Sequence, residues 1–201
     1  EFPKWNAPVV SLIAQKSKDP FRVLVCALIS TRTKDETTAK VCQKLFEKVK
    51  GVDDLLKISE KELAELLYPV GFYKNKAKFL KEIAKELKER YSSQVPSSLE
   101  ELLKLKGVGR KVANLVLAEG YGVPAICVDT HVHRITNRWC LVKTKTPEET
   151  EIKLMEILPK EHWIEFNKLL VAFGQTICKP QKPMCHSCPV ERYCEYPNKC
   201  K

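Results

Sequence analysis

Long apolar runs are missing from this chain of 201 residues. No uncharged run approaches the roughly eighteen residues that a membrane-spanning helix needs. The first residues, EFPKWNAPVV, lack the basic start, apolar stretch and cleavage site of a secretory signal. Seven glycines and twelve prolines leave little room for low-complexity linkers. The sequence therefore predicts an intracellular protein, of cytoplasm or nucleoid, with one ordinary domain or two small ones.

The charge balance favours a polyanionic partner. Lysine and arginine number 35 against 25 acidic residues, a formal net charge of +10, and 44% of the residues are hydrophobic, enough for a proper core. Basic side chains gain free energy by releasing counterions from phosphates, so the excess suits nucleic acid. A solvated, ion-paired surface accounts for the same composition, and at this point both interpretations stand.

Helical periodicity runs through nearly the whole chain. Residues 75–91 place Leu, Ile, Ala, Leu and Tyr on one stripe, with lysine and glutamate opposite. Ser98 with Glu101, and Thr146 before a proline, are typical of helix starts. Only residues 125–128 resemble a strand, and four residues are too few to predict one. The fold class is therefore all-α, with many short helices before a tail rich in cysteine and proline.

A glycine hairpin interrupts the helices in the stretch LKLKGVGRKVA. The pattern predicts a helix that ends at Lys106, a turn from Gly107 to Gly109, and a new helix from about Arg110. Two glycines allow positive φ and let a phosphate approach the backbone closely. The N–H groups of Gly109, Arg110 and Lys111 would lie at a helix N-terminus, which favours an anion. A plain helix–helix turn is the alternative.

An acidic residue and a group of cysteines follow the hairpin. Asp129, in CVDTHVHR, comes after an apolar run and predicts an N-cap for the helix that carries His133 and Arg134. Five of the nine cysteines fall within residues 178–201. Such a group is either a disulfide knot or a metal site, and without a secretory signal a metal site is favoured.

Together, these segments resemble the endonuclease III family of DNA base-excision glycosylases. The resemblance rests on LKGVGRKVANLVL, then VDTHVHR, then four cysteines spaced C-x6-C-x2-C-x5-C. ISTRTKD (residues 29–35) and VGFYKNKA (residues 70–77) are also similar to that family's segments and stand in the right order. The hairpin alone is moderately specific, whereas hairpin, aspartate and cysteine spacing in this order are highly specific. The resemblance covers nearly the whole chain.

The resemblance implies two helical domains with a central cleft. Residues 18–122 would form one domain and carry the helix-hairpin-helix motif. Residues 1–17 and 123–201 would form the other, with the four-cysteine loop near its end. Asp129 would then face Lys111 across the cleft.

The resemblance also implies a bifunctional DNA glycosylase and AP lyase that acts on oxidised pyrimidines. Lys111 matches the amine nucleophile that attacks the sugar C1′ and forms a Schiff base. Asp129 matches the carboxylate that stabilises positive charge on the sugar. The target base must be flipped out of the duplex, and Phe72 matches the family's wedge. A solvent-facing lysine, a helix cap and a core aromatic are the ordinary structural roles of these three residue types.

Further residues are expected to contact DNA. Arg32 stands where bacterial members of the family often carry a glutamine that contacts the unpaired base, which leaves the reading of that base open. Lys106 replaces a frequent proline, a change expected to alter the stiffness of the turn and not its chemistry. The full set of expected DNA contacts is Gly107, Gly109, Arg110, Phe72, Arg32, His131, Lys179 and Lys182.

The remaining motif resembles the family's [4Fe–4S] site, and its residues are Cys178, Cys185, Cys188 and Cys194. Four thiolates suit iron or zinc. Zinc ribbons mostly pair two CxxC knuckles, whereas this chain has a single CxxC flanked by spacers of six and five. The spacing therefore favours a [4Fe–4S] cluster as the cofactor. Cys200 lies outside the spacing and is expected to be free.

Two alternative functions stay open. A uracil or thymine mismatch DNA glycosylase belongs to the same class, while a non-catalytic DNA-binding module would use the hairpin and the cysteine loop for docking only. Lys111 and Asp129 together count against the module, since docking needs neither. The expected partner is double-stranded DNA with damaged bases or abasic sites, bound by a monomer with no membrane involved.

Overall fold

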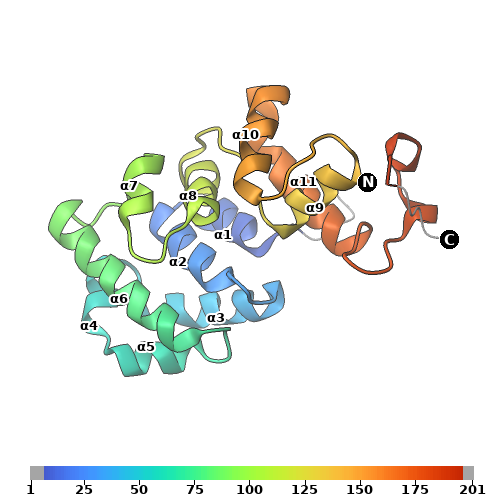
Figure 1. Cartoon of the computed structure of the whole chain (residues 1–201). Helices are drawn as coiled ribbons and strands as arrows, with labels where there is room; N and C mark the ends of the chain where they lie inside the picture. The colour runs from blue at the N-terminus through green and yellow to red at the C-terminus, as the bar shows by residue number, and fades with distance from the viewer. Residues whose placement is uncertain (1–6, 197–201) are drawn as a thin grey trace. The chain divides into compact units, whose positions relative to one another are not determined.

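A computed structural model describes residues 7–196, which form helices and connecting loops with no strand among them (Figure 1). The chain divides into two compact units. One is Val9–Val123, and the described part of the other comprises residues 7–8 and 124–196. The all-α fold class is thereby confirmed. None of the helices within residues 7–196 has the length and apolar character needed to cross a membrane.

The first unit contains eight α-helices and a π-helical turn among its described residues. They are α1 (Val9–Ser17), α2 (Pro20–Ser30), α3 (Asp35–Lys48), α4 (Val52–Lys57), α5 (Glu60–Leu67), α6 (Tyr73–Arg90), α7 (Leu99–Lys104), α8 (Arg110–Leu115) and the π-helix η2 (Val116–Gly120). The second unit contains α9 (Thr130–Arg138), α10 (Pro147–Ile157), η3 (Lys160–His162), α11 (Trp163–Thr176), η4 (Cys185–Ser187) and η5 (Glu191–Tyr193).

Helix α2 forms the centre of the Val9–Val123 unit. Asp19 caps its first turn by accepting a hydrogen bond from the N–H of Phe21 at 2.9 Å, and Pro20 opens the helix. Residues 23–29, VLVCALI, are all buried. A helix that is apolar on every face must be surrounded by others, and α2 contacts α1, α3, α6, α8 and η2.

Helix α1 belongs to this same unit, which corrects one predicted domain boundary. Val9, Val10 and Ala14 are buried and α1 packs on α2. Ser11 Oγ also donates a hydrogen bond to Glu119 Oε1 at 2.7 Å. Residues 9–17 therefore lie with the Val9–Val123 unit and not, as predicted, with the C-terminal one.

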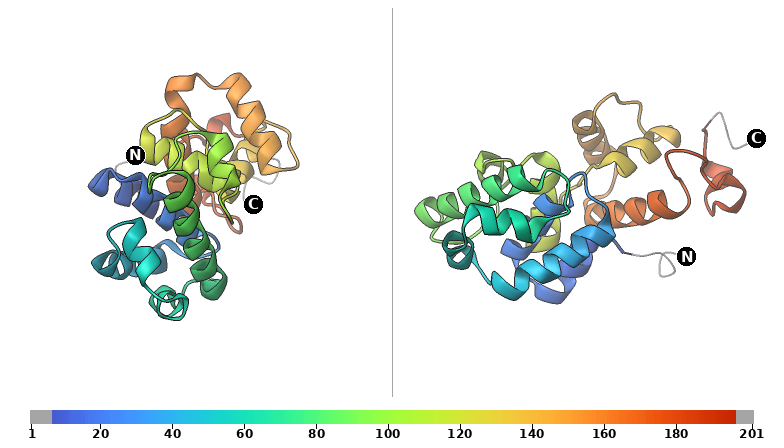
Figure 2. Two further views of the ribbon diagram at one scale, coloured as in Figure 1. Left: turned by 90° about the vertical axis from the view of Figure 1, so that its left-hand side faces the viewer. Right: turned by 90° about the horizontal axis from the view of Figure 1, so that it is seen from below.

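Helix α6 confirms the apolar stripe predicted for residues 75–91 except at its end, because Tyr91 follows the helix as its C-cap and is only half-buried. Leu80, Ile83, Ala84 and Leu87 are buried, and the helix packs on α4 and α5 (Figures 1 and 2). Lysine and glutamate cover its other face, so α6 joins the core through one side only.

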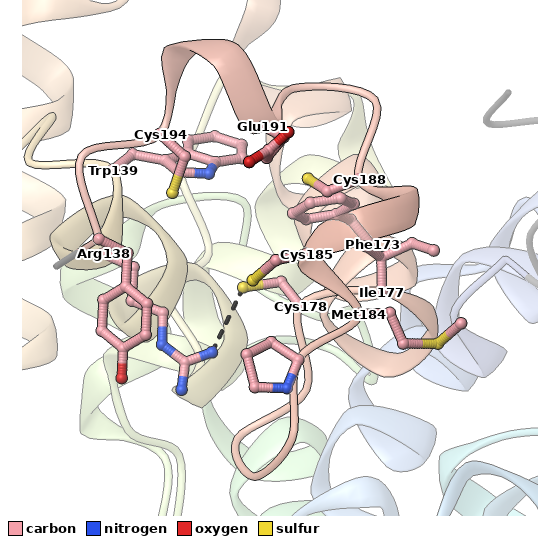
Figure 3. A pocket seen from close by; sticks show the side chains of 12 residues that line it. Arg138, Trp139, Phe173, Ile177, Cys178, Met184, Cys185, Cys188, Glu191 and Cys194 are labelled. Atoms are coloured by element: carbon pink, nitrogen blue, oxygen red, sulfur yellow. Dashed lines mark hydrogen bonds between the residues drawn. The ribbon is translucent and has the colours of Figure 1, made fainter. Parts of the chain in front are cut away.

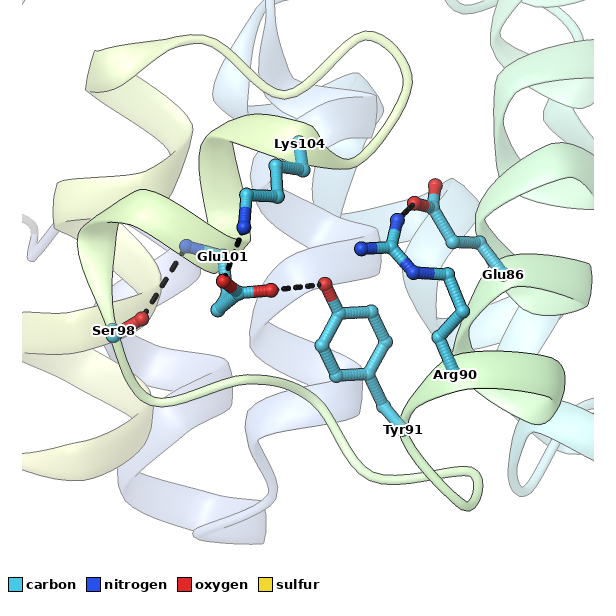
Figure 4. A network of polar contacts seen from close by, with 6 residues as sticks. All are labelled: Glu86, Arg90, Tyr91, Ser98, Glu101 and Lys104. Atoms are coloured by element: carbon cyan, nitrogen blue, oxygen red, sulfur yellow. Dashed lines mark hydrogen bonds and ion pairs between the residues drawn. The ribbon is translucent and has the colours of Figure 1, made fainter.

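A polar network connects the end of α6 to α7, the first helix of the hairpin (Figure 4). Tyr91 Oη donates to Glu101 Oε2 at 2.7 Å, and Lys104 binds the other oxygen of the same carboxylate. Ser98 Oγ accepts a hydrogen bond from the N–H of Glu101 at 3.3 Å, which confirms the predicted cap of α7. The start of the hairpin is thus held by side chains on both sides of the preceding loop.

The second unit is built around α9 and α11, which pack against each other. Val132 and Ile135 of α9 share a hydrophobic core with Leu170 and Phe173 of α11. Cys178 and Cys188 are packed against this core, so the C-terminal loop is attached to the hydrophobic centre of the unit. The predicted cap at Thr146 is also present, because its Oγ1 accepts from the N–H of Glu149 at 3.1 Å.

Candidate active site

The glycine hairpin joins α7 to α8 largely as the sequence predicts. Helix α7 ends at Lys104, two residues before the predicted end, and α8 begins at Arg110 as predicted. The N–H of Val108 donates to the carbonyl of Leu105 at 3.1 Å, and the Val108 side chain is buried. The turn is therefore anchored through its middle residue while its two glycines stay at the surface.

The two glycines serve different purposes, which corrects the expectation that both allow positive φ. Gly107 has φ +77°, and a Cβ there would lie 2.7 Å from the ring of Phe79. Gly109 has φ −95°, and no heavy atom lies within 4 Å of a Cβ added there. Glycine is thus required at position 107 both by the positive φ and by the close approach of the Phe79 ring. Gly109 leaves open space at the N-terminus of α8, a position that favours an anion.

Arg110 and Lys111 occupy the first turn of α8, and both are half-buried. The residues that follow, 112–115, are buried, so α8 is anchored in the core of the unit. Burial, and then the nearby charge of Lys111, lowers the pKa of Lys76 to about 8. Two amines from different helices, α6 and α8, therefore share this part of the unit.

Arg32 and Phe72 form an exposed pair, although they are far apart in the sequence. The Arg32 guanidinium lies over the Phe72 ring, 5.5 Å from its centroid. Phe72 is 60% exposed, which excludes the alternative that it is a core aromatic. Both residues adopt left-handed backbone, with φ 52° and 57°, at a cost of about 1–3 kcal/mol each. The fold thus brings together two residues predicted to contact DNA.

Asp129 is the N-cap of α9, as predicted. Its Oδ1 accepts hydrogen bonds from the N–H groups of His131 at 2.8 Å and Val132 at 2.9 Å. The residue is half-buried and comes after residues 125–128, which are buried and run in no regular secondary structure. Because both bonds fall on Oδ1, capping uses one of the two carboxylate oxygens.

His131, predicted to contact DNA, is half-buried within the second unit. Its Nδ1 lies 3.1 Å from Arg134 Nη2. The ring also packs so closely on Gly174 of α11 that no Cβ fits there. These contacts give His131 a structural role in joining α9 to α11, while its predicted contact with DNA stays a prediction.

The four predicted metal ligands line one pocket in the C-terminal loop (Figure 3). Cys178, Cys185, Cys188 and Cys194 are all half-buried, and burial raises the pKa of the Cys188 thiol. The remaining wall is largely apolar and includes Trp139, Phe173, Ile177, Pro183 and Met184. Cys200 lies outside the described residues.

The donor set, four thiolates around one pocket, is chemically suited to an iron–sulfur cluster. Within residues 7–196, no three cysteine, histidine or carboxylate side chains converge closely enough to hold one metal ion. A structural zinc would draw four sulfurs to about 2.3 Å from a single point. In an iron–sulfur cluster the thiolates bind different iron atoms, which spreads the sulfurs around a larger centre. Four thiolates around one pocket are compatible with that larger centre.

Sequence reasoning missed two arginines of α9 that bind the four-cysteine loop. Arg138 Nη1 donates to Cys178 Sγ at 3.4 Å and to the Lys179 carbonyl at 2.7 Å. Its Nη2 donates to the Pro180 carbonyl at 2.8 Å, and Arg134 Nη2 donates to the Cys178 carbonyl at 2.7 Å. The signal in the sequence was their spacing of four residues, which places both on one helix face.

Lys179 and Lys182, predicted to contact DNA, are both exposed on the four-cysteine loop. Lys182 has left-handed backbone, with φ 48°. The loop between Cys178 and Cys185 is thus fixed at its base by Arg138 and presents two lysines to solvent.

The comparisons with known protein sequences agree on one family. The model of the "HhH-GPD superfamily base excision DNA repair protein" matches residues 25–160. An endonuclease III of Thermotoga maritima is 50% identical over 181 residues, which are 90% of this chain and 85% of that protein. Endonuclease III-like protein 1 of Bos taurus is 43% identical over 91% of this chain and 64% of its own length.

Solved structures show the same fold. A non-covalent endonuclease III–DNA complex superposes with a TM-score of 0.88 at 36% identity, covering 97% of this chain and 89% of that one. A trapped covalent endonuclease III–DNA intermediate gives a TM-score of 0.85 at 37% identity, covering 89% and 84%. A thermostable thymine-DNA glycosylase gives 0.81 at 26% identity, covering 96% and 94%.

Proposed function

Because the chain belongs to the HhH-GPD superfamily of base excision DNA repair proteins, and within it to the endonuclease III family, we propose that it removes oxidised pyrimidines from DNA as a bifunctional glycosylase and AP lyase. The observation that carries the proposal is Lys111 in the first turn of α8, directly after the hairpin. It stands on a fold shared with an endonuclease III that was trapped covalently on DNA.

DNA is the partner, and the hairpin is the first contact that we assign. A phosphate approaches the N-terminus of α8 through the open space at Gly109. Arg110 adds a positive charge beside it. Because backbone groups and a helix terminus make this contact, it orients the duplex without reading its sequence. We propose that the protein binds as a monomer.

Lys111 is the nucleophile in this proposal. Its Nζ lone pair attacks C1′ of the flipped nucleotide, and the C1′–N bond breaks with its electron pair leaving on the base. The attached amine loses a proton, and its lone pair then forms the C1′=N bond while the C1′–O4′ bond breaks and O4′ takes up a proton, which leaves a Schiff base between Lys111 and the opened sugar. Removal of a C2′ proton then breaks the C3′–O bond by β-elimination, which cuts the strand 3′ to the lesion.

Asp129 supplies the negative charge that this reaction requires. Positive charge develops on the sugar as the base departs, and a fixed carboxylate stabilises it. The two N–H groups of α9 hold Oδ1 in place at 2.8 and 2.9 Å. The second oxygen, Oδ2, is the atom that we assign to the sugar.

The exposed pair of Arg32 and Phe72 serves as the wedge. Flipping a base leaves a hole in the duplex, and an apolar side chain inserted there replaces the lost stacking. Phe72 supplies the apolar ring, and Arg32 supplies a planar cation with several donors for the base left unpaired. The left-handed backbone of both residues is typical of strained functional sites.

The four cysteines of the C-terminal loop hold a [4Fe–4S] cluster in this proposal. When bound, the cluster supplies a structural crosslink between the two ends of the loop rather than a step of the reaction. Arg138 fixes the base of that loop to α9. Lys179 and Lys182 then reach DNA phosphates from it, as the charge of an exposed basic loop favours.

A cleavage panel tests this function. Duplexes that carry thymine glycol, 5-hydroxycytosine, uracil, 8-oxoguanine or an abasic site are incubated with wild type and with Lys111→Gln. We expect cleavage of the two oxidised pyrimidines and of the abasic site by wild type, with strand cutting lost in Lys111→Gln. Wild type that binds the abasic duplex but cuts nothing would support the non-catalytic module instead.

A second candidate function is a uracil or thymine mismatch glycosylase. The likeness to the thermostable thymine-DNA glycosylase favours it, at 26% identity over nearly the whole chain. Adding G·T and G·U duplexes to the panel distinguishes the two. Faster release of thymine or uracil than of thymine glycol would favour the mismatch activity.

A further inference from the structure

Lys76 is a buried cation that the proposed chemistry does not use. It is 6% exposed, and its Nζ donates hydrogen bonds to the carbonyls of Ile29 at 2.7 Å and Thr31 at 2.5 Å and to Thr33 Oγ1 at 3.3 Å. An ammonium has three N–H donors, and three oxygens receive them. Because burying a charge is unfavourable unless it is fully bonded, this arrangement specifies the position of each partner.

The partners of Lys76 lie on both sides of Arg32. Helix α2 ends at Ser30, so the Ile29 carbonyl belongs to its C-terminal end, where the helix dipole favours a cation. Thr31 and Thr33 are the immediate neighbours of Arg32. The three bonds therefore hold the turn in which Arg32 adopts φ 52°.

The same turn also holds the segment that carries Phe72. The N–H of Gly71 donates to Thr33 Oγ1 at 3.3 Å, so this hydroxyl is shared with Lys76. A Cβ at Gly71 would lie 2.7 Å from the Arg32 carbonyl oxygen. The two chain segments are thus in direct contact, and Phe72 follows at once with φ 57°.

We propose that Lys76 is a positioning residue, which, through Thr33 and Gly71, keeps Arg32 and Phe72 side by side in the geometry that enters DNA. This inference rests on the proposed function, since the wedge is assigned there. Two non-glycine residues in left-handed backbone persist only where their surroundings enforce it. Without the buried ammonium, both turns are able to relax and the exposed pair separates.

Lys81 offers a matched control on the same helix. Its Nζ donates to the carbonyls of Leu55 at 3.0 Å, Leu56 at 2.7 Å and Ile58 at 2.6 Å. These oxygens close the end of α4, so Lys81 makes the same kind of three-acceptor contact at a different place. Removing it frees the carbonyls at a helix end, as Lys76→Met also does, without touching Arg32 or Phe72.

The experiment measures lesion selectivity, defined as the Kd for an undamaged duplex divided by the Kd for one with a tetrahydrofuran abasic analogue. We expect Lys76→Met to lower this ratio about tenfold, which is close to the decrease expected for Phe72→Ala. In both variants the Phe72 ring no longer stacks in the place of the missing base. Lys76→Arg should restore part of it, since a guanidinium still donates several hydrogen bonds. Lys81→Met should keep the ratio within about twofold of wild type.

Thr33→Val decides the question if Lys76→Met does not fold, because it removes only the shared hydroxyl. It should lower the ratio in the same direction. A Lys76→Met or Thr33→Val protein that keeps wild-type selectivity, while Phe72→Ala loses it, overturns the positioning role. If Phe72→Ala also keeps the wild-type ratio, Phe72 does not act as the wedge. If the wild-type protein does not bind the abasic analogue more tightly than the undamaged duplex, the proposed function itself is contradicted.

Discussion

Asp129 has two roles that one pair of substitutions separates. As the N-cap of α9 it accepts two backbone hydrogen bonds on Oδ1. As the proposed catalytic carboxylate it supplies a charge. Asparagine caps helices about as well as aspartate, so Asp129→Asn keeps the cap and removes the charge, whereas Asp129→Ala removes both.

The expected magnitudes follow from these contacts. Asp129→Asn should slow base release by about 10²- to 10³-fold, the usual effect of removing one electrostatic contact to a transition state. Its free energy of unfolding should fall by no more than about 1 kcal/mol, from the lost interaction with the helix dipole. Asp129→Ala should lose about 1 kcal/mol more of its free energy of unfolding, because the cap is also lost. Its rate of base release should be similar to that of Asp129→Asn.

Single-turnover release of thymine glycol and denaturant unfolding are the two assays. Thr146→Ala is the matched control, because Thr146 caps α10 in the same unit through one bond of 3.1 Å. It should lose about 1 kcal/mol of stability and release the base at the wild-type rate. Wild-type base release by Asp129→Asn, or equal slowing by Thr146→Ala, would refute the catalytic role.

Three further predictions concern the loop and the buried lysine. Protein purified without oxygen should show the broad visible absorbance of an iron–sulfur cluster; a colourless protein with one zinc per chain contradicts this. Arg138→Gln, which loses the contact with Cys178 Sγ, should lose that absorbance in air several-fold faster than the control Arg192→Gln. Arg192 lies in η5, and its guanidinium is over the Tyr193 ring, 4.5 Å from the centroid. Equal rates in the two variants would contradict a role of Arg138 in anchoring the loop. Finally, the pKa of Lys76 is about 8 in the folded chain against 10.5 ordinarily. Between these two pH values the unfolded chain binds more protons than the folded chain. The free energy of unfolding of wild type, relative to that of Lys76→Met, should therefore rise with pH by about 3 kcal/mol at most. A difference between the two proteins that stays constant or falls with pH would contradict the lowered pKa.

The elements that the sequence predicts well are those set by local chemistry. The stripe of α6 follows from the period of its apolar residues, and the caps at Ser98, Asp129 and Thr146 follow from a side-chain oxygen before a helix. The grouping of the four cysteines around one pocket is predictable for the same reason, since their spacing is local. The start of α8 at Arg110 follows from the glycines before it.

The features that the sequence did not predict depend on partners far along the chain. Lys76 stands four residues before Leu80 on the buried stripe, a position that signals an unusual lysine. It does not identify the acceptors, which lie at the end of α2 and in the turn that follows it. Gly109 was expected to use positive φ. The folded turn shows instead that its missing side chain leaves open space at the N-terminus of α8. The placement of α1 depends on packing with α2 and on Glu119, which periodicity does not report.

The role of Lys111 as nucleophile is tested most directly by borohydride trapping on an abasic duplex, followed by mass spectrometry of the peptide that carries the adduct. We expect one adduct, on Lys111, and none in Lys111→Gln, which still binds the duplex because the hairpin backbone makes the phosphate contact. An adduct at wild-type yield in Lys111→Gln, or one that maps to its neighbour Lys76, would contradict the claim that Lys111 is the nucleophile.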